Sequence, residues 1–142
     1  MAVRCGDRSQ GKLPVINRMR ELIAYTYDRV HDKTLPKADR WLMCKSIWDA
    51  AAGAHAAILA ANGIRVENQT DAEERLLLEK KAIGQLDTLM ALIDMLHIKG
   101  RISDDRAEYW TGLANSAQIA AKAWLKNQKS YYREYLRAEE GG

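Results

Sequence analysis

The sequence of 142 residues has no phenylalanine and contains only two prolines and two cysteines. Pro14 and Pro36 lie outside the segments with helical periodicity, so neither interrupts a long helix. Cys5 and Cys44 are far apart and show no CxxC or zinc-ligand spacing, which indicates reduced thiols. The stretch 50–61 is too short and too alanine-rich to span a bilayer, and the N-terminus lacks the apolar core of a signal peptide. We therefore expect a soluble, cytoplasmic protein.

The residues that are abundant favour helices. Hydrophobic residues make up 47% of the chain and charged residues 29%, a balance typical of one folded globular domain at this length. Alanine, leucine, glutamate, lysine, arginine and glutamine fill the periodic segments, and runs of β-branched residues are absent. The aromatic residues are four tryptophans and six tyrosines, which often lie where a core meets water or a partner. The composition predicts an all-α protein.

The boundaries of two helices can be read in the first half of the chain. The first helix is predicted over 14–33, with Pro14 at its first position, where a missing backbone N–H does no harm. The second follows a link at 34–36 and extends to about residue 62. Gly63 is predicted to end it as a left-handed C-terminal cap.

Two further helices are predicted in the second half. Thr70 and Glu73 form an expected capping box at the start of the third helix, which ends near residue 99 at Gly100. Ser103, followed by two aspartates, is predicted to cap the fourth. Short links between long helices favour an antiparallel up-down-up-down four-helix bundle. We expect an N-terminal extension over 1–13, the bundle over 14–127 and a basic, tyrosine-rich tail over 128–142 that can extend the fourth helix.

Apolar residues recur at three- and four-residue steps, which predicts the inward face of each helix. The expected inward residues are Ile16, Met19, Ile23, Tyr27 and Val30 in the first helix, and Trp41, Cys44, Ile47 or Trp48, Ala51, His55, Ile58 and Leu59 in the second. In the third they are Leu76, Ile83, Leu86, Met90, Ile93 and His97, with Leu89, Leu92 and Leu96 beside them. In the fourth they are Trp110, Leu113, Ala114, Ala117, Ala121 and Trp124, with Leu125 as a further candidate. The wide apolar face of the third helix predicts burial on two sides, by the bundle and by another subunit of a homo-oligomeric barrel.

Catalytic and metal-binding motifs do not occur in this sequence. His31, His55 and His97 lie one per helix, and none follows a glutamate at the Glu-x-x-His step of bundle metal sites. They are interpreted as structural histidines, with a cluster assembled in three dimensions as the alternative. No serine has a nucleophile-elbow context, and no glycine-rich phosphate loop follows a strand. We expect a protein that is not an enzyme and has neither a metal nor a cofactor.

A basic segment near the C-terminus is the main positive feature. Between residues 122 and 137, five basic residues face one acid, Glu134, and their spacing places them on one helical ridge: Lys122, Lys126, Lys129, Arg133 and Arg137. Tyr131, Tyr132 and Tyr135 are interleaved with them. Cations can neutralise phosphates and tyrosines can stack on unpaired bases, which favours RNA binding. The alternative is a solvated helix end with favourable C-terminal cations. Further candidate RNA contacts are Lys37, Arg40, Arg75, Lys80 and Lys81.

Several short motifs occur in order along residues 16–126. They are Tyr25–Thr26–Tyr27, Leu35–Pro36–Lys37–Ala38–Asp39–Arg40, the leucine-rich stretch 86–96, Gly100–Arg101–Ile102–Ser103, and then Tyr109, Leu113 and Trp124. This order resembles the accessory variability proteins (Avd) of diversity-generating retroelements, within a wider family of small bacterial four-helix-bundle proteins. One departure is Lys122–Ala123, which stands where that family usually has two small residues.

The resemblance implies a basic homopentamer that binds the element's reverse transcriptase and its template RNA. Such accessory proteins support error-prone cDNA synthesis and the transfer of that cDNA into a variable target gene (mutagenic retrohoming), without being enzymes themselves. Related bundle proteins encoded in ribosomal RNA intervening sequences share much of the pattern. A helix-bundle scaffold of that type, with no retroelement role, is therefore the alternative function.

Overall fold

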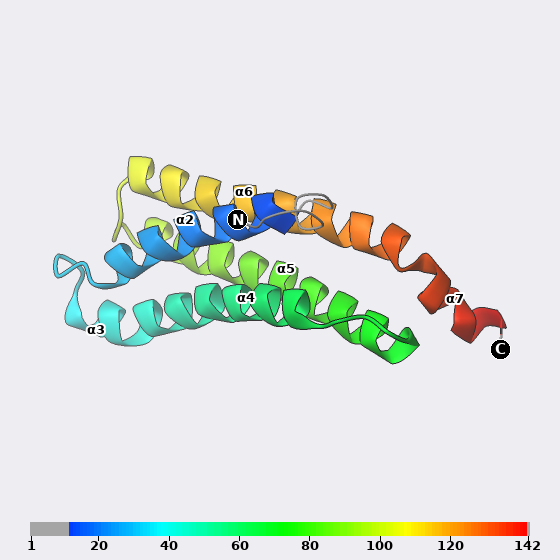
Figure 1. Ribbon diagram of the computed structural model, residues 1–142. Coiled ribbons are helices and arrows are strands. Elements are labelled where there is room, and N and C mark those ends of the chain that lie inside the picture. The colour runs from blue at the N-terminus through cyan, green and yellow to red at the C-terminus, as the bar shows by residue number, and fades with distance from the viewer. Residues whose placement is uncertain (1–11, 142) are drawn as a thin grey trace, which may run out of the picture.

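The computed structural model describes residues 12–141 and consists of helices, with no strand in that range (Figure 1). Its four long helices are α2 (Lys12–Val30), α4 (Lys45–Gly63), α5 (Gln69–Ile98) and α6 (Asp104–Tyr131). Three short elements complete it: α3 (Lys37–Asp39), the π-helical turn η2 (Arg40–Cys44) and α7 (Arg133–Gly141). Consecutive long helices run in opposite directions (Figure 1). The predicted all-α bundle of four long helices is confirmed.

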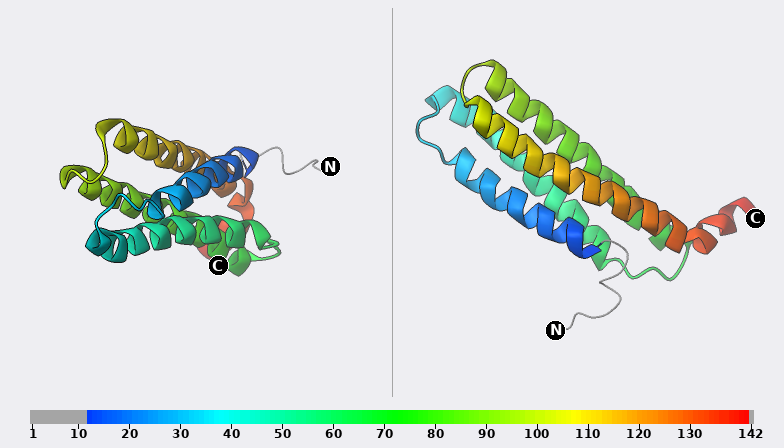
Figure 2. Two further views of the ribbon diagram at one scale, coloured as in Figure 1. Left: turned by 90° about the vertical axis from the view of Figure 1, so that its left-hand side faces the viewer. Right: turned by 90° about the horizontal axis from the view of Figure 1, so that it is seen from above.

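The helices pack along most of their length, and α7 extends beyond the end of the bundle (Figure 2). The α4 helix packs mainly on α5, whereas α2 packs on α6 and α4. None of the helices between residues 12 and 141 is long and apolar enough to cross a membrane. Most of the predicted N-terminal extension, with Cys5, lies outside the described residues.

The turn between α5 and α6 matches its sequence signals. Gly100 has a φ of +70°, and its N–H donates to the His97 carbonyl while the N–H of Arg101 donates to that of Leu96. This is the Schellman arrangement, in which a left-handed glycine satisfies the last carbonyls of a helix. The Ser103 side chain then accepts a hydrogen bond from the Arg106 N–H at 3.2 Å. Both predicted boundary residues are confirmed.

Two other predicted boundaries are wrong. The α5 helix is capped by Asn68, whose side chain accepts a hydrogen bond from the Asp71 N–H at 2.9 Å, so the Thr70–Glu73 capping box does not form. Asparagine caps a helix as well as threonine does, and here it precedes the predicted cap by two residues. The α4 helix includes Gly63 and ends without a left-handed residue, because the chain continues in an extended conformation at Ile64.

The core is built from large side chains of α5 and α6 packed against small side chains. Trp110 and Trp124 are fully buried, as the fourth-helix pattern predicted. Alanines dominate the buried face of α4 between Ala50 and Ala61, which allows α5 to approach closely. Leu86 and Ile93 of α5 are also buried as predicted. Leu76, Leu89 and Leu96 are buried as predicted too. The remaining predicted positions of α5 lie at the margin of the core: Ile83, Met90, Leu92 and His97.

The inward face of α2 differs from the predicted one. Its buried residues are Val15, Met19, Leu22 and Thr26, whereas Tyr27 is exposed. Thr26 is buried because its hydroxyl accepts a hydrogen bond from the Trp110 indole N–H at 3.0 Å. Apolar periodicity cannot reveal a buried threonine, so the predicted stripe was rotated by about one residue.

The start of the second helix also departs from prediction. Trp41 is 75% exposed and Leu42 is 64% exposed, although Cys44 and Ile47 are buried as predicted. Both exposed residues lie in η2, the π-helical turn. A π-turn holds more residues than an α-turn, so it shifts the residues before it around the helix axis relative to those after it. A stripe drawn with a constant helical period therefore misplaces Trp41. Leu59, farther along α4, is also exposed instead of buried.

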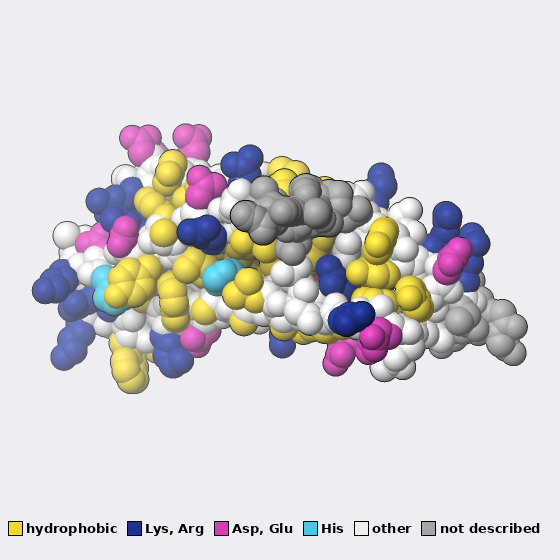
Figure 3. Space-filling model, in the orientation of Figure 1, with side chains coloured by type: hydrophobic (Ala, Val, Ile, Leu, Met, Phe, Trp, Pro, Cys, Tyr) yellow, Lys and Arg dark blue, Asp and Glu magenta, His cyan; other side chains and the backbone are white. Residues whose placement is uncertain are grey.

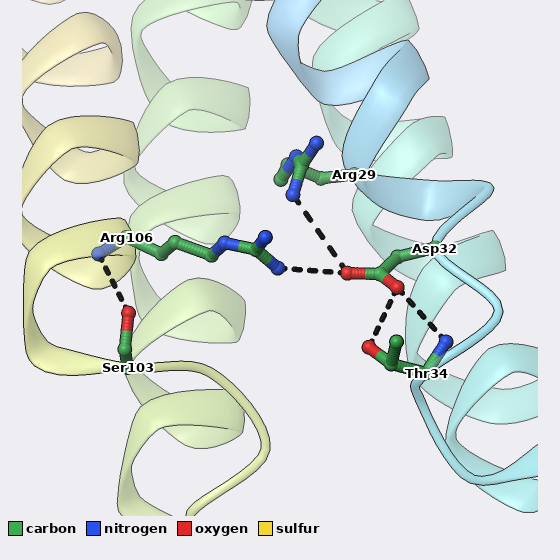
Figure 4. Close-up of polar contacts among 5 residues, drawn as sticks. All are labelled: Arg29, Asp32, Thr34, Ser103 and Arg106. Carbon is green, nitrogen blue, oxygen red and sulfur yellow. Dashed lines mark hydrogen bonds and ion pairs between the residues drawn. The ribbon is translucent and has the colours of Figure 1, made fainter.

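A polar cluster ties the link after α2 to the start of α6 (Figure 4). The Asp32 carboxylate accepts hydrogen bonds from the Thr34 hydroxyl and N–H at 2.6 and 2.9 Å, and from the Arg106 guanidinium at 2.8 Å. Arg29 lies 3.7 Å from the same carboxylate. The hydrogen bonds from Thr34, followed by Arg106, lower the pKa of Asp32. This cluster joins segments that are distant in sequence.

Candidate nucleic-acid interface

The basic segment lies at the end of the bundle from which α7 projects (Figure 1). Lys122, Lys126 and Lys129 are exposed on α6, while Arg133 and Arg137 are exposed on α7. The two helices are separated at Tyr132, which caps α6. Their spacing alone predicted one continuous helical ridge. This prediction is wrong, because the five cations are divided between two helices. We call these five residues the α6–α7 cations.

Most of the α6–α7 cations carry uncompensated charge. No acidic side chain in the described part of the chain lies within ion-pair distance of Lys122, Lys126, Lys129 or Arg133. An exposed cation without an acidic partner can bind a phosphate without first breaking an ion pair within the protein, so its binding costs the least free energy.

A cation from α5 lies beside this group. Lys80 and Lys129 line one open cleft of about 490 Å³, whose apolar lining residues include Leu77 and Leu136. Lys81 follows on the same helix and is also exposed. The cleft also contains one acid, Glu73. Tertiary packing thus brings two of the predicted cations, 49 residues apart in sequence numbering, to the same surface.

Arg75, another predicted RNA contact, is almost entirely buried. Only 8% of the residue is exposed. Its Nε donates a hydrogen bond to the Gln128 side chain at 2.6 Å, and its Nη1 donates to the Ile64 carbonyl at 2.9 Å. The guanidinium carbon lies 5.5 Å from the ring centres of both Trp124 and Tyr132. Arg75 is therefore a fixed interior cation that links α5 to the end of α6, not part of an exposed phosphate-binding surface.

Glu79 is a second buried charged residue, one turn further along α5. Its Oε2 lies 3.6 Å from the Arg75 Nε, and its side chain is 1% exposed. Neither carboxyl oxygen has a hydrogen-bond partner among the described residues. Burial raises the pKa of Glu79 to about 8, because the cost of removing the carboxylate from water exceeds the attraction of Arg75. At neutral pH this carboxyl is protonated, so the charge of Arg75 is not neutralised.

Sequence reasoning missed Glu79 and Gln128 as interior residues. An arginine and a glutamate four residues apart are usually an exposed ion pair on a helix surface. The only signal available was the position of Arg75 and Glu79 on the same face as Leu76 and Ala82, which are buried.

Lys37 and Arg40 lie at the opposite end of the molecule, in α3 and η2 (Figure 1). Both are exposed. Figure 3 shows cationic side chains around both ends of the long axis. At the α3 end, however, Asp39 pairs with Arg101, and Asp32 pairs with Arg106. Lys37 and Arg40 are a separate surface and do not join the α6–α7 cations.

The histidines lie on different parts of the fold. The His31 ring contacts the Tyr27 carbonyl at 2.7 Å, and His97 Nε2 lies 2.6 Å from Asp104. His55 is half-buried on α4, and burial lowers its pKa. Between residues 12 and 141 no group of three or more histidine, cysteine or acidic side chains is arranged to hold a metal ion. Cys44 is buried, which raises the pKa of its thiol and disfavours the reactive thiolate.

The chain matches no protein-family model, no curated protein and no solved structure. The structure therefore describes the protein as a bundle of four long helices. At one end of this bundle, lysines from α5 and α6 line one cleft, and exposed tyrosines lie nearby.

Proposed function

We propose that this chain is a non-enzymatic RNA-binding accessory protein. In the form that the Avd resemblance implies, it binds a reverse transcriptase and the template RNA of a diversity-generating retroelement in the cytoplasm. There it would support error-prone cDNA synthesis and mutagenic retrohoming. The observation that carries the RNA part of this proposal is that Lys129 on α6 and Lys80 on α5 line the same cleft. Beside them lie further cations that have no acidic partner among the described side chains.

The physical basis is the release of counterions from RNA. Each phosphate neutralised by a lysine or arginine on a single strand contributes about 0.7 to the slope of log affinity against log salt. If all five α6–α7 cations contact phosphates, they contribute a slope of roughly 3.5 in total. Such binding depends on charge and position, with little dependence on base sequence.

The test is a salt titration of binding to a fluorescein-labelled single-stranded RNA. Replacing Lys126, Lys129 and Arg133 together with glutamine preserves helix propensity and should reduce the salt slope by about 2. A matched control replaces Lys33, Lys37 and Lys99 with glutamine, which removes the same charge from the α3 end. Circular dichroism should show both variants folded.

The outcomes separate two surfaces. A reduced slope for the α6–α7 variant, with an unchanged slope for the control, supports the proposed interface. Equal slopes for the wild type and the α6–α7 variant would show that these cations are only solvated. A loss confined to the control would place RNA at the α3 end, near Lys37 and Arg40.

The proposal includes assembly into a homopentameric barrel. Support comes from apolar side chains that the single bundle leaves in water on α5, among them Leu77 and Ile98. Light scattering should return about five times the chain mass of 16.1 kDa. A monomer at micromolar concentration would remove this part of the proposal without affecting the RNA surface.

The second candidate function is a helix-bundle scaffold of the ribosomal RNA intervening-sequence type, with no retroelement role. The exposure of Trp41 and Leu42 on η2 favours it, because aromatic residues concentrate binding energy at protein interfaces and π-turns often lie at functional sites. Affinity for a protein partner would then fall on replacing Trp41 with serine and would depend little on salt. RNA binding with a steep salt slope would reject this alternative.

A further inference from the structure

A second cleft opens on the other side of the α6–α7 junction. It has a volume of about 420 Å³ and lies between the segment that follows α4 and the tyrosines of the junction. Its lining residues are Ile64, Arg65, Val66, Arg75, Tyr131, Tyr132 and Tyr135. This volume is within the range of sites that hold small ligands, roughly 300–1,000 Å³. The lining combines aromatic rings with guanidinium groups.

The rings have separate roles. Tyr132 lies against Arg75, with 5.5 Å between the guanidinium carbon and the ring centre, so one of its faces is occupied. Tyr131 packs edge-on to Tyr132 at 4.9 Å and remains 65% exposed. Tyr135 is 6.3 Å from Tyr132 and 38% exposed. Tyr131 and Tyr135 therefore present ring surface to the cleft that a flat ligand can cover.

The charge of the cleft is positive. Arg75 is held by Gln128 and by the Ile64 carbonyl, so its position does not depend on a ligand. Burial disfavours the ionised form of Glu79, so this carboxyl does not fully offset the positive charge of Arg75. Arg65 adds a second guanidinium, whose only ion pair among the described residues is an exposed one with Glu67 at 3.5 Å. Exposed pairs of this kind are weak and exchange readily for a phosphate.

We propose that this cleft binds one nucleotide unit, whose base stacks on Tyr131 and Tyr135 while its phosphate pairs with the exposed Arg65. The buried Arg75 adds positive charge to the wall of the cleft without pairing with the phosphate directly. The inference rests on the proposed RNA-binding function and deepens it. The α6–α7 cations hold phosphates of any sequence, whereas this cleft selects an unpaired nucleotide. A duplex cannot enter it, because its bases are already stacked and paired.

The experiment uses the full-length protein and three RNAs of one sequence: a labelled single strand, the same strand with abasic positions, and the perfect duplex. The test variant replaces Tyr131 and Tyr135 with leucine, which keeps apolar bulk but removes the aromatic faces. The control replaces Tyr109 with leucine, an exposed tyrosine near the start of α6 at the opposite end.

Base stacking on an aromatic side chain changes affinity by about 5- to 150-fold per base. The double tyrosine variant should lose an amount in this range for the intact single strand and nothing for the duplex. Wild-type protein should lose a similar factor when the RNA is abasic, and the variant should show no additional loss. Replacing Arg65 with glutamine should also reduce the salt slope for the single strand by about 0.7.

A free nucleotide carries the same base and phosphate groups as a nucleotide within RNA. Competition with adenosine monophosphate distinguishes these two possible ligands. Displacement of the single strand assigns the site to free nucleotides as well, and lack of displacement assigns it to RNA. If the double tyrosine variant loses the same affinity for intact RNA as for abasic RNA, the tyrosines do not stack on a base. This result would overturn the nucleotide site and leave the cleft to a protein partner. The proposed function fails separately, when the Lys126, Lys129 and Arg133 variant keeps its full salt slope.

Discussion

Replacing Glu79 with glutamine should stabilise the fold at neutral pH, by an amount that grows as the pH rises. Glutamine has nearly the shape of the protonated carboxyl group and cannot ionise. The wild-type side chain is 1% exposed and has no hydrogen-bond partner for either oxygen among the described residues. The fold therefore accepts the neutral form and disfavours the ionised one.

The magnitude follows from the pKa of the folded state. Burial raises the pKa of Glu79 from 4.5 to about 8, so between these values the folded chain holds a proton that the unfolded chain has lost. Stability then falls as pH rises, by about 1.4 kcal/mol per pH unit. The loss is roughly 3 kcal/mol at pH 7 and reaches about 5 kcal/mol above pH 8. Below pH 4.5 both states are protonated and the loss disappears.

The measurement is urea unfolding of both proteins, followed by far-ultraviolet circular dichroism between pH 4.5 and 8. The free energies of unfolding should nearly coincide at the acidic end and diverge steadily towards pH 8. Glu74 is exposed on the same helix, so its replacement by glutamine is the matched control and should leave the pH dependence of the wild type unchanged.

The competing interpretation predicts that Glu79→Gln lowers the free energy of unfolding instead of raising it. If Glu79 were ionised and held by Arg75, removing it would leave an unpaired buried guanidinium and cost about 3–5 kcal/mol. A destabilised Glu79→Gln variant at pH 7 would therefore refute the reasoning, as would parallel pH curves for the variant and the wild type.

Three further predictions concern stability measured by urea unfolding. Trp41→Ser should change the free energy of unfolding by no more than about 0.5 kcal/mol, and a loss of several kcal/mol would show that Trp41 is packed. Gly112→Ala should stabilise α6 by about 0.5–1 kcal/mol, because the added Cβ meets open space. Gly100→Ala should destabilise the fold by about 1–2 kcal/mol, because Gly100 has a φ of +70°. Equal effects of the two substitutions would contradict this reasoning. Because the pKa of Asp32 is lowered, its ionised form stabilises the fold above the unfolded value of 3.8 and that contribution is lost as pH falls. Asp32→Asn should therefore be less stable than wild type at about pH 6, with a difference that shrinks in acid; a constant difference would reject the cause.

Features that depend on a few neighbouring residues could be predicted from the sequence. Gly100 and Ser103 mark a helix end and a helix start because each acts on backbone groups within four residues. The same locality explains why the capping box at Thr70 failed, since Asn68 offers an equivalent cap two residues earlier. Trp110 and Trp124 were assigned correctly to the core because no other position of the fourth helix offers as much apolar surface.

The interior polar residues could not be predicted in this way. Thr26 is buried by a hydrogen bond from Trp110, a residue 84 positions away. Gln128 is buried by its hydrogen bond to Arg75, across 53 positions. Both side chains are stable in the core because a partner on another helix satisfies their hydrogen bonds. Each such partner is known only once the helices have been packed.

The sequence by itself determined that the chain is helical, that it forms four long helices, and that positive charge and tyrosines gather near its C-terminus. Helix propensity, capping and composition are local properties, and they do not depend on which helices become neighbours. Only the tertiary structure decided that Lys80 and Lys129 line one cleft, that burial raises the pKa of Glu79, and that Arg75 lies against both Trp124 and Tyr132. Burial, pKa and the shape of a cleft are set by contacts between helices, and these contacts carry no signature in the residues adjacent in the chain.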